Sequence, residues 1–90
     1  MTNRQVLENF LQGKYAESDN GNLKSYPATD SYPGQLINYW TVIAEKFGTT
    51  HIMLNIRGYS KTTTTIINKL REITKEEGFG VIEYEGKKRY

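Results

Sequence analysis

The chain has 90 residues, which suffice for one domain with a modest core, and 37% of them are hydrophobic. It has no cysteine and one histidine, which excludes disulfides and thiolate metal sites and argues against a histidine-based zinc site. The formal net charge is +2, and the basic excess lies in residues 51–90, where eight basic side chains face five acidic ones and Lys87, Lys88 and Arg89 form a short tail.

The first predicted element is a short N-terminal helix over residues 3–12. Thr2 and Gln5 fit the capping-box pattern, in which each side chain satisfies the backbone of the other residue. Val6, Phe10 and Leu11 fall on one helical face behind this cap. Gly13 is placed to end the helix.

Residues 14–35 are polar and rich in turn formers, with Asn20-Gly21, two Tyr-Pro pairs and Pro33-Gly34. Only residues 23–26 look like a strand. Each residue before a proline is pushed towards extended geometry, so Tyr26 and Tyr32 are expected in loop or edge backbone. We therefore predict a long loop at 14–35, which in so small a domain is either functional or mobile.

Residues 36–47, LINYWTVIAEKF, fit two patterns. Ile37, Trp40, Ile43, Ala44 and Phe47 recur at helical spacing, whereas the succession of aromatic and β-branched residues is typical of a strand. We prefer the strand, because the Gly-Thr-Thr sequence at 48–50 would connect it to the next strand as a hairpin.

The most regular part of the chain is a strand followed by a helix. Alternation over 51–57 places Ile52, Leu54 and Ile56 in the core, with the intervening residues facing out. A turn at Gly58-Tyr59 then leads into the main helix, over about 60–77. A last short strand is expected at 80–84.

The main helix has clear signals at both of its ends. Ser60 is a candidate N-cap, and Gly78 is placed at the C′ position, where glycine tolerates the left-handed backbone. Between them the apolar residues recur at helical spacing: Ile66, Ile67, Leu70 and Ile73.

Together these elements predict an α+β fold in one domain, residues 1–90. We expect a small antiparallel sheet of three to four strands, packed by the main helix and flanked by the N-terminal helix. The other sheet face should remain partly open. Alternation assigns to that face His51, Met53, Asn55 and Arg57, and leaves undecided which side of residues 36–47 joins them.

The strand–helix junction is the candidate site for an anion, because a helix N-terminus presents free N–H groups and a partial positive charge. Helix capping by hydroxyl groups, without any ligand, also explains why the start of the main helix is rich in serine and threonine. Arg57 is the strongest candidate for a functional role, because a helix N-terminus repels a cation and a structural role gives little reason for an arginine there. The candidate site comprises Arg57, Lys61, Ser60, Thr62, Thr63, Asn55, Tyr59, Asn38 and Tyr39.

Several separated segments resemble a family of short uncharacterised proteins carried by phages and other mobile elements. The matching elements are Asn22-Leu23, the Tyr-x-Thr-x-Ile-Ala segment at 39–44, Asn55, and the Tyr-Ser-x-Thr-Thr helix start at 59–63. The likeness covers about residues 20–70, and Trp40 and Ile66 depart from it. The resemblance implies a phage-type context and no particular activity.

No catalytic motif is present, and we expect a protein that is not an enzyme and needs neither cofactor nor metal. The first hypothesis is that it binds DNA or RNA through the open sheet face and the start of the main helix. The alternative is a protein-binding inhibitor or adaptor that acts on a host enzyme or defence system. A homodimer through the open face or a sheet edge is compatible with both. Lacking a signal peptide or membrane-spanning run, the protein is expected in the host cytoplasm without membrane contact.

Overall fold

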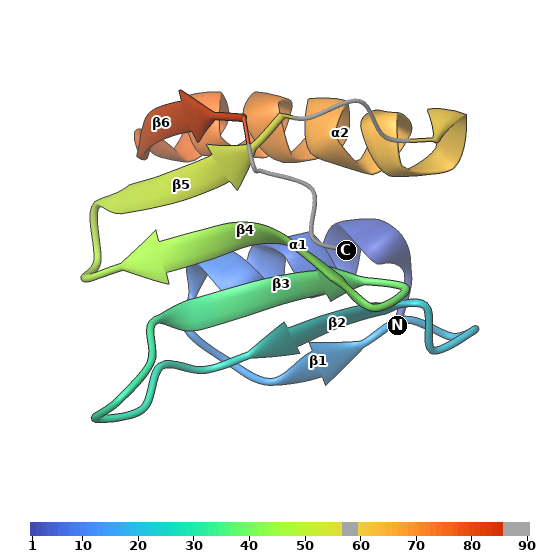
Figure 1. Cartoon of the computed structure of the whole chain (residues 1–90), viewed down its shortest axis with the longest axis horizontal. Coiled ribbons are helices and arrows are strands. Elements are labelled where there is room, and N and C mark those ends of the chain that lie inside the picture. Colours follow the sequence, from blue (N-terminus) through green and yellow to red (C-terminus); the bar gives the residue numbers. More distant parts are fainter. Residues whose placement is uncertain (57–59, 86–90) are drawn as a thin grey trace.

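The computed structural model describes residues 1–56 and 60–85 of the chain. Two helices and six strands follow one another in this part: α1 (Asn3–Leu11), β1 (Ala16–Glu17), β2 (Leu23–Tyr26), β3 (Gly34–Asn38), β4 (Thr41–Phe47), β5 (His51–Asn55), α2 (Lys61–Glu77) and β6 (Gly80–Tyr84). Both helices lie behind the sheet in the view of Figure 1. The α+β class predicted from the sequence is confirmed.

All six strands form one sheet in the order of the sequence, β1-β2-β3-β4-β5-β6. The first five pair antiparallel, while β6 pairs parallel to β5 after the crossover through α2. The predicted sheet of three to four antiparallel strands is therefore wrong in strand number and in the direction of its last strand. The pairing of β5 with β6 joins residues that are far apart in sequence. The alternation of apolar and polar residues within one strand does not indicate such a partner or its direction.

Two segments differ from their sequence interpretation. Residues 36–47 are not one strand, because β3 and β4 meet at a two-residue turn of Tyr39 and Trp40. Within the loop expected at 14–35, the strand-like stretch at 23–26 is indeed a strand, β2, but β1 and the first residues of β3 were not anticipated. The expectation of loop or edge backbone at Tyr26 is wrong, because β2 lies inside the sheet between β1 and β3. These short strands depend on their partners across the sheet, and not on a strong local pattern.

α1 begins and ends through local chemistry that the sequence predicted. The Thr2 side chain accepts from Gln5 N, the Gln5 side chain accepts from Thr2 N, and Gly13 follows the helix with φ 74°. Four apolar residues are buried against the sheet and α2: Val6, Leu7, Phe10 and Leu11. Burying such side chains contributes about 1.5–3 kcal/mol each.

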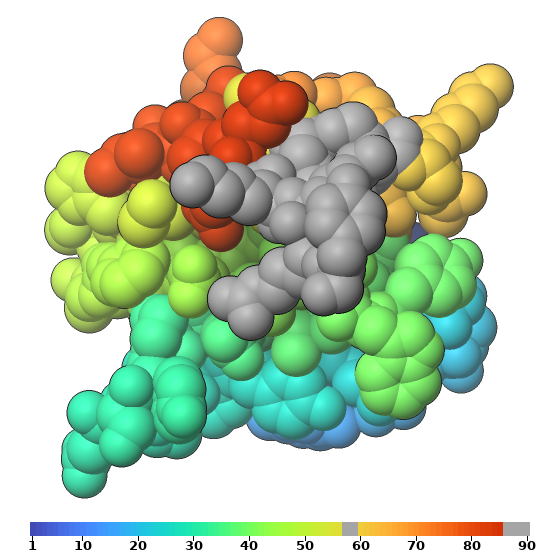
Figure 2. Space-filling model, in the orientation of Figure 1, coloured from blue at the N-terminus to red at the C-terminus, as the bar shows by residue number. Residues whose placement is uncertain are grey.

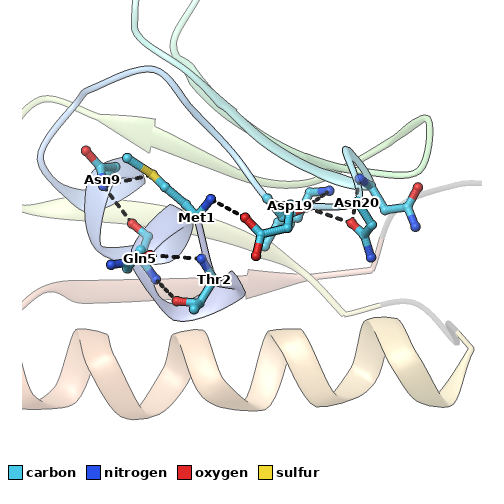
Figure 3. A network of polar contacts seen from close by, with 9 residues as sticks. Met1, Thr2, Gln5, Asn9, Asp19 and Asn20 are labelled. Atoms are coloured by element: carbon cyan, nitrogen blue, oxygen red, sulfur yellow. Dashed lines mark hydrogen bonds and ion pairs between the residues drawn. The ribbon is translucent and has the colours of Figure 1, made fainter.

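The start of α1 is joined to the β1–β2 turn by the network drawn in Figure 3. The Met1 ammonium lies 2.6 Å from Asp19 Oδ1, and the backbone N–H of Asp19 donates to Met1 O at 2.9 Å. The Asn9 amide donates to the Gln5 carbonyl at 2.7 Å and to Met1 Sδ at 3.8 Å. This network fixes the turn after β1 relative to the first helix.

α2 has the caps and the buried face expected of it. Ser60 Oγ accepts from Thr63 N at 3.4 Å, and Gly78 adopts φ 76° at the C-terminal end. The four predicted apolar residues are buried, together with Thr63 and Thr74. α2 packs against α1 and β6, so the two helices cover the same side of the sheet.

A β-bulge changes which side chains of β4 face the helices. Leu36 pairs with Ala44 and Ile37 with Val42, so Ile43 has no partner on β3. Both Ile43 and Ala44 are fully buried. The bulge brings two consecutive residues into the core and moves Val42 to the opposite face, which simple alternation does not anticipate.

The sheet face away from the helices carries a mixed set of side chains. Cross-strand register assigns to it Lys24, Tyr26, Gln35, Ile37, Val42, Glu45, Met53, Ile82 and Tyr84. His51 shares this face and is exposed, as predicted. Asn55 is only 8% exposed, and Ile56, expected in the core, lies beyond β5 and is exposed. Arg57 lies outside the described residues.

Candidate functional site

Three segments meet at one end of the molecule: the β1–β2 turn, the β3–β4 turn and the start of α2, all at the right in Figure 1. Asn38, the last residue of β3, connects them. Its amide nitrogen donates to Asn22 O at 3.1 Å, and its Oδ1 accepts from Thr63 Oγ1 at 2.6 Å. We call this region the turn end.

The polar residues at the centre of the turn end are buried. Asn38 is 3% exposed and Thr63 is 6% exposed. A buried amide whose donor and acceptor are both paired holds the surrounding backbone in place and is costly to remove. Asn38 and Thr63 therefore support the surface of the turn end and do not form it.

The start of α2 presents a cation beside free helix N–H groups. Lys61 and Thr62 are exposed, and the first turn has no acidic residue. Among the described residues, no ion pair includes Lys61. The helix dipole and this lysine together favour an anionic group at this position.

The β3–β4 turn exposes two aromatic residues on a strained backbone. Tyr39 has φ 54° and is the one residue other than glycine with positive φ in residues 1–56 and 60–85. Its N–H donates to Asn22 O at 2.8 Å. Trp40 is 97% exposed, and in Figure 2 the green turn stands out at the right of the molecule. Strained positions held by their surroundings are concentrated at functional sites.

Next to this turn the open sheet face contains a pocket of about 170 Å³. We call it the aromatic pocket. Its walls come from the β1–β2 turn, β2, β3 and the β3–β4 turn: Gly21, Asn22, Lys24, Tyr26, Ile37, Tyr39 and Trp40. Tyr15 supports one wall, because its ring lies edge-on to Tyr26 with centroids 5.5 Å apart.

The charges around the aromatic pocket nearly balance. Lys24 lines it and belongs to no ion pair among the described residues. Glu17 is the cross-strand neighbour of Lys24, and its Oε2 would lie 3.3 Å from a Cβ on Gly21. Its Oε1 accepts from Tyr15 at 2.9 Å, and this hydrogen bond is the largest cause of the raised pKa of Tyr15.

The residues predicted from the sequence have different positions in the structure. Ser60, Thr63, Asn38 and Tyr39 come together at the turn end, with Lys61 and Thr62 exposed beside them. Asn55 is buried in β5 and has an interaction partner. Arg57 and Tyr59 lie outside the described residues.

The nucleic-acid or anion site predicted from the sequence did not include Lys24, Tyr26 and Trp40. The alternation of β2 was a usable signal, since buried Leu23 and Ser25 imply that Lys24 and Tyr26 face the other side. Trp40 gave no such signal, because a tryptophan between strand formers is typical of a strand and not of a turn.

Within the part of the chain that the structure describes, no group of three or more metal-binding side chains occurs. Neither of its helices combines the length and the apolar character needed to cross a bilayer. Comparison of the chain with models of protein families, with curated proteins and with solved structures finds no match.

Proposed function

We propose that this protein is a non-enzymatic, phage-type accessory protein that binds single-stranded nucleic acid at the turn end and along the open sheet face. The observation that carries the proposal is the exposure of Trp40, 97%, on a strained turn fixed beside the start of α2. Trp40 is not isolated, because Tyr39 and Tyr26 are exposed and line the same pocket, and exposed aromatic side chains that gather on a strained turn favour a role in contact with a ligand.

Two chemical requirements of single-stranded nucleic acid are met at this end. Exposed aromatic rings allow unpaired bases to stack, which contributes about 1–3 kcal/mol per base. The start of α2 and Lys61 offer N–H groups and a positive charge to a phosphate. DNA and RNA satisfy both requirements equally, so the proposal covers both.

The test is fluorescence anisotropy with labelled single-stranded and double-stranded oligonucleotides at a series of salt concentrations. We expect tighter binding of single strands and affinity that falls as salt rises. Lys61→Ala should reduce the slope of log K against log salt by about 0.7, the value for one lost phosphate contact in a single strand.

Lys75→Ala is the matched control, because Lys75 is exposed in the last turn of the same helix. Its salt slope should equal that of the unmodified protein. Absence of binding at low salt, or equal slopes for both lysine variants, would refute the role of the α2 start.

One observation favours the alternative, a protein-binding inhibitor or adaptor that acts on a host enzyme or defence system. The β2–β3 loop projects from the sheet in Figures 1 and 2, and Tyr32 near its tip is 67% exposed. Thr29 stabilises the loop, since its Oγ1 accepts from Tyr32 N at 3.1 Å and its N–H donates to Tyr32 O at 2.9 Å. An ordered exposed tyrosine is a typical anchor of protein interfaces.

A pull-down from host lysate tests this alternative with Tyr32→Ala as the variant and Trp40→Ala as the control. Stoichiometric capture of one host protein that is lost in Tyr32→Ala and kept in Trp40→Ala would favour the alternative. Equal capture by both variants would count against a role of the β2–β3 loop.

A further inference from the structure

We infer that the aromatic pocket, which Trp40 lines, binds the base of one unpaired nucleotide. The pocket contacts the base of that nucleotide and not its phosphate. The inference rests on the proposed function and specifies which part of the ligand this pocket recognises. It assigns direct contacts to Trp40, Tyr26 and Lys24, which the predicted nucleic-acid site did not include.

The walls of the pocket suit a flat ring. Three of the lining side chains are aromatic, Tyr26, Tyr39 and Trp40, and Ile37 adds an apolar surface from β3. At about 170 Å³ the pocket holds a small planar group, not an extended chain. Stacking on aromatic side chains is the contact that every base can make, because every base has a π-face.

The polar groups suit a neutral ring with hydrogen-bonding edges better than a phosphate. Lys24 offers a donor, while Glu17 lies behind Gly21 with one carboxylate oxygen engaged by Tyr15. The carboxylate offsets the charge of Lys24 and would repel a phosphate placed between them. A base edge carries acceptors for Lys24 and brings no negative charge near Glu17.

Tyr26 and the backbone of the β3–β4 turn are held in place before any ligand arrives. Tyr26 is held by the edge-on ring of Tyr15, and the β3–β4 turn is tied to Asn22 O by Tyr39 N and by the Asn38 amide. Binding to a preformed pocket avoids the entropy cost of ordering these side chains. This preorganisation suits a contact that must compete with stacking inside the nucleic acid itself.

Trp40 is the one tryptophan of the chain, so its intrinsic fluorescence reports directly on the pocket. The probes are oligothymidylate and a strand of the same length built from abasic sites, titrated at one low salt concentration. Oligothymidylate should quench and shift the emission, and the abasic strand should leave it unchanged while still binding through its phosphates.

Trp40→Ala should weaken binding of oligothymidylate by about tenfold or more, with an unchanged salt slope. The side chain is almost fully exposed, so its removal should leave the fold intact, which circular dichroism checks. Tyr32→Ala removes another exposed aromatic ring, from a different loop, and should bind normally.

Two results would contradict base binding in the pocket and leave the proposed function standing. One is salt-sensitive binding of both strands with unchanged Trp40 emission, and the other is normal affinity of Trp40→Ala. Binding of neither strand at low salt would overturn both. Emission changed equally by the two strands would show phosphate recognition at the pocket and would also overturn the inference.

Discussion

The hydroxyl of Thr63 donates to Oδ1 of Asn38 at 2.6 Å, and this buried hydrogen bond joins the first turn of α2 to the end of β3. The two residues are 25 positions apart in sequence. Their pairing fixes where the helix start lies relative to the exposed Trp40, and it therefore determines the geometry of the turn end.

Removal of this contact should destabilise the protein. Asn38→Ala leaves the buried Thr63 hydroxyl without its acceptor, while the Asn22 carbonyl keeps the hydrogen bond from Tyr39 N. The expected cost is about 1–3 kcal/mol in the free energy of unfolding. Urea denaturation measures this cost, and Thr63→Val should show a loss of the same order. Thr62→Val, an exposed neighbour in the same helical turn, should change stability by less than about 0.5 kcal/mol. A similar loss in all three variants would contradict a specific role of the pair.

The His51 ring occupies the space that a side chain at position 80 would need. A Cβ on Gly80 would lie 2.5 Å from Cδ2 and 2.8 Å from Nε2 of the His51 ring, which Thr50 Oγ1 contacts at Nδ1. Gly80→Ala should therefore displace the exposed His51 ring, at a cost of about 0.5–1.5 kcal/mol, the range for a side chain moved off its preferred rotamer. In a His51→Ala background most of this cost should disappear, and a double-mutant cycle by urea denaturation measures the difference. An equal cost in both backgrounds would exclude the steric explanation.

The strain at Tyr39 predicts opposite effects on stability and binding. Tyr39→Gly relieves a left-handed residue that costs about 1–2 kcal/mol, against a glycine entropy cost of about 0.5–1 kcal/mol. Thermal unfolding should show a gain of roughly 0.5–1 kcal/mol, while affinity for oligothymidylate falls with the lost ring. Trp40→Gly is the control, since Trp40 has no positive φ and should show no gain in stability.

Tyr84 should make the protein less stable in alkaline solution. Its pKa is raised above 10.0 by burial and, to a smaller extent, by the charge of Glu45. Because the folded state holds this proton more tightly than the unfolded state, the resulting stability is present below pH 10 and is lost as pH rises through the folded pKa. Urea midpoints measured from about pH 8 to pH 11 should fall less for Tyr84→Phe than for the unmodified protein. Parallel curves for the two proteins would show that Tyr84 has no such role.

The helix ends could be predicted from the sequence because capping is local chemistry. Thr2 with Gln5, Ser60 and Gly78 each act within a few residues of their own position, and all are where the sequence placed them. The apolar face of α2 follows for the same reason, because its spacing is set by the helix itself.

The sheet was harder to predict because its features depend on partners distant in sequence. The turn at Tyr39 and Trp40 lacks the usual glycine or asparagine, and the bulge at Ile43 breaks the alternation. β1 is recognisable only beside β2, and the parallel direction of β6 follows from the crossover.

For the candidate site, the sequence named Asn38, Ser60 and Thr63 as ligand contacts, whereas in the structure their side chains form hydrogen bonds within the turn end. It did not find the walls of the aromatic pocket. Their proximity arises from strand register, which brings Lys24 opposite Ile37 and Tyr26 opposite Gln35 on one face.

The sheet order has a consequence for how the molecule is made. From β1 to β5 every strand pairs with its immediate predecessor in the chain, so each hairpin can close as soon as its second strand leaves the ribosome. β6 is different, since it can join β5 only after all of α2 has been synthesised and has folded back. Synthesis from the N-terminus therefore leaves the β5 edge unpaired until β6 has emerged from the ribosome, and in that interval this edge of the nascent chain is exposed to pairing with another copy.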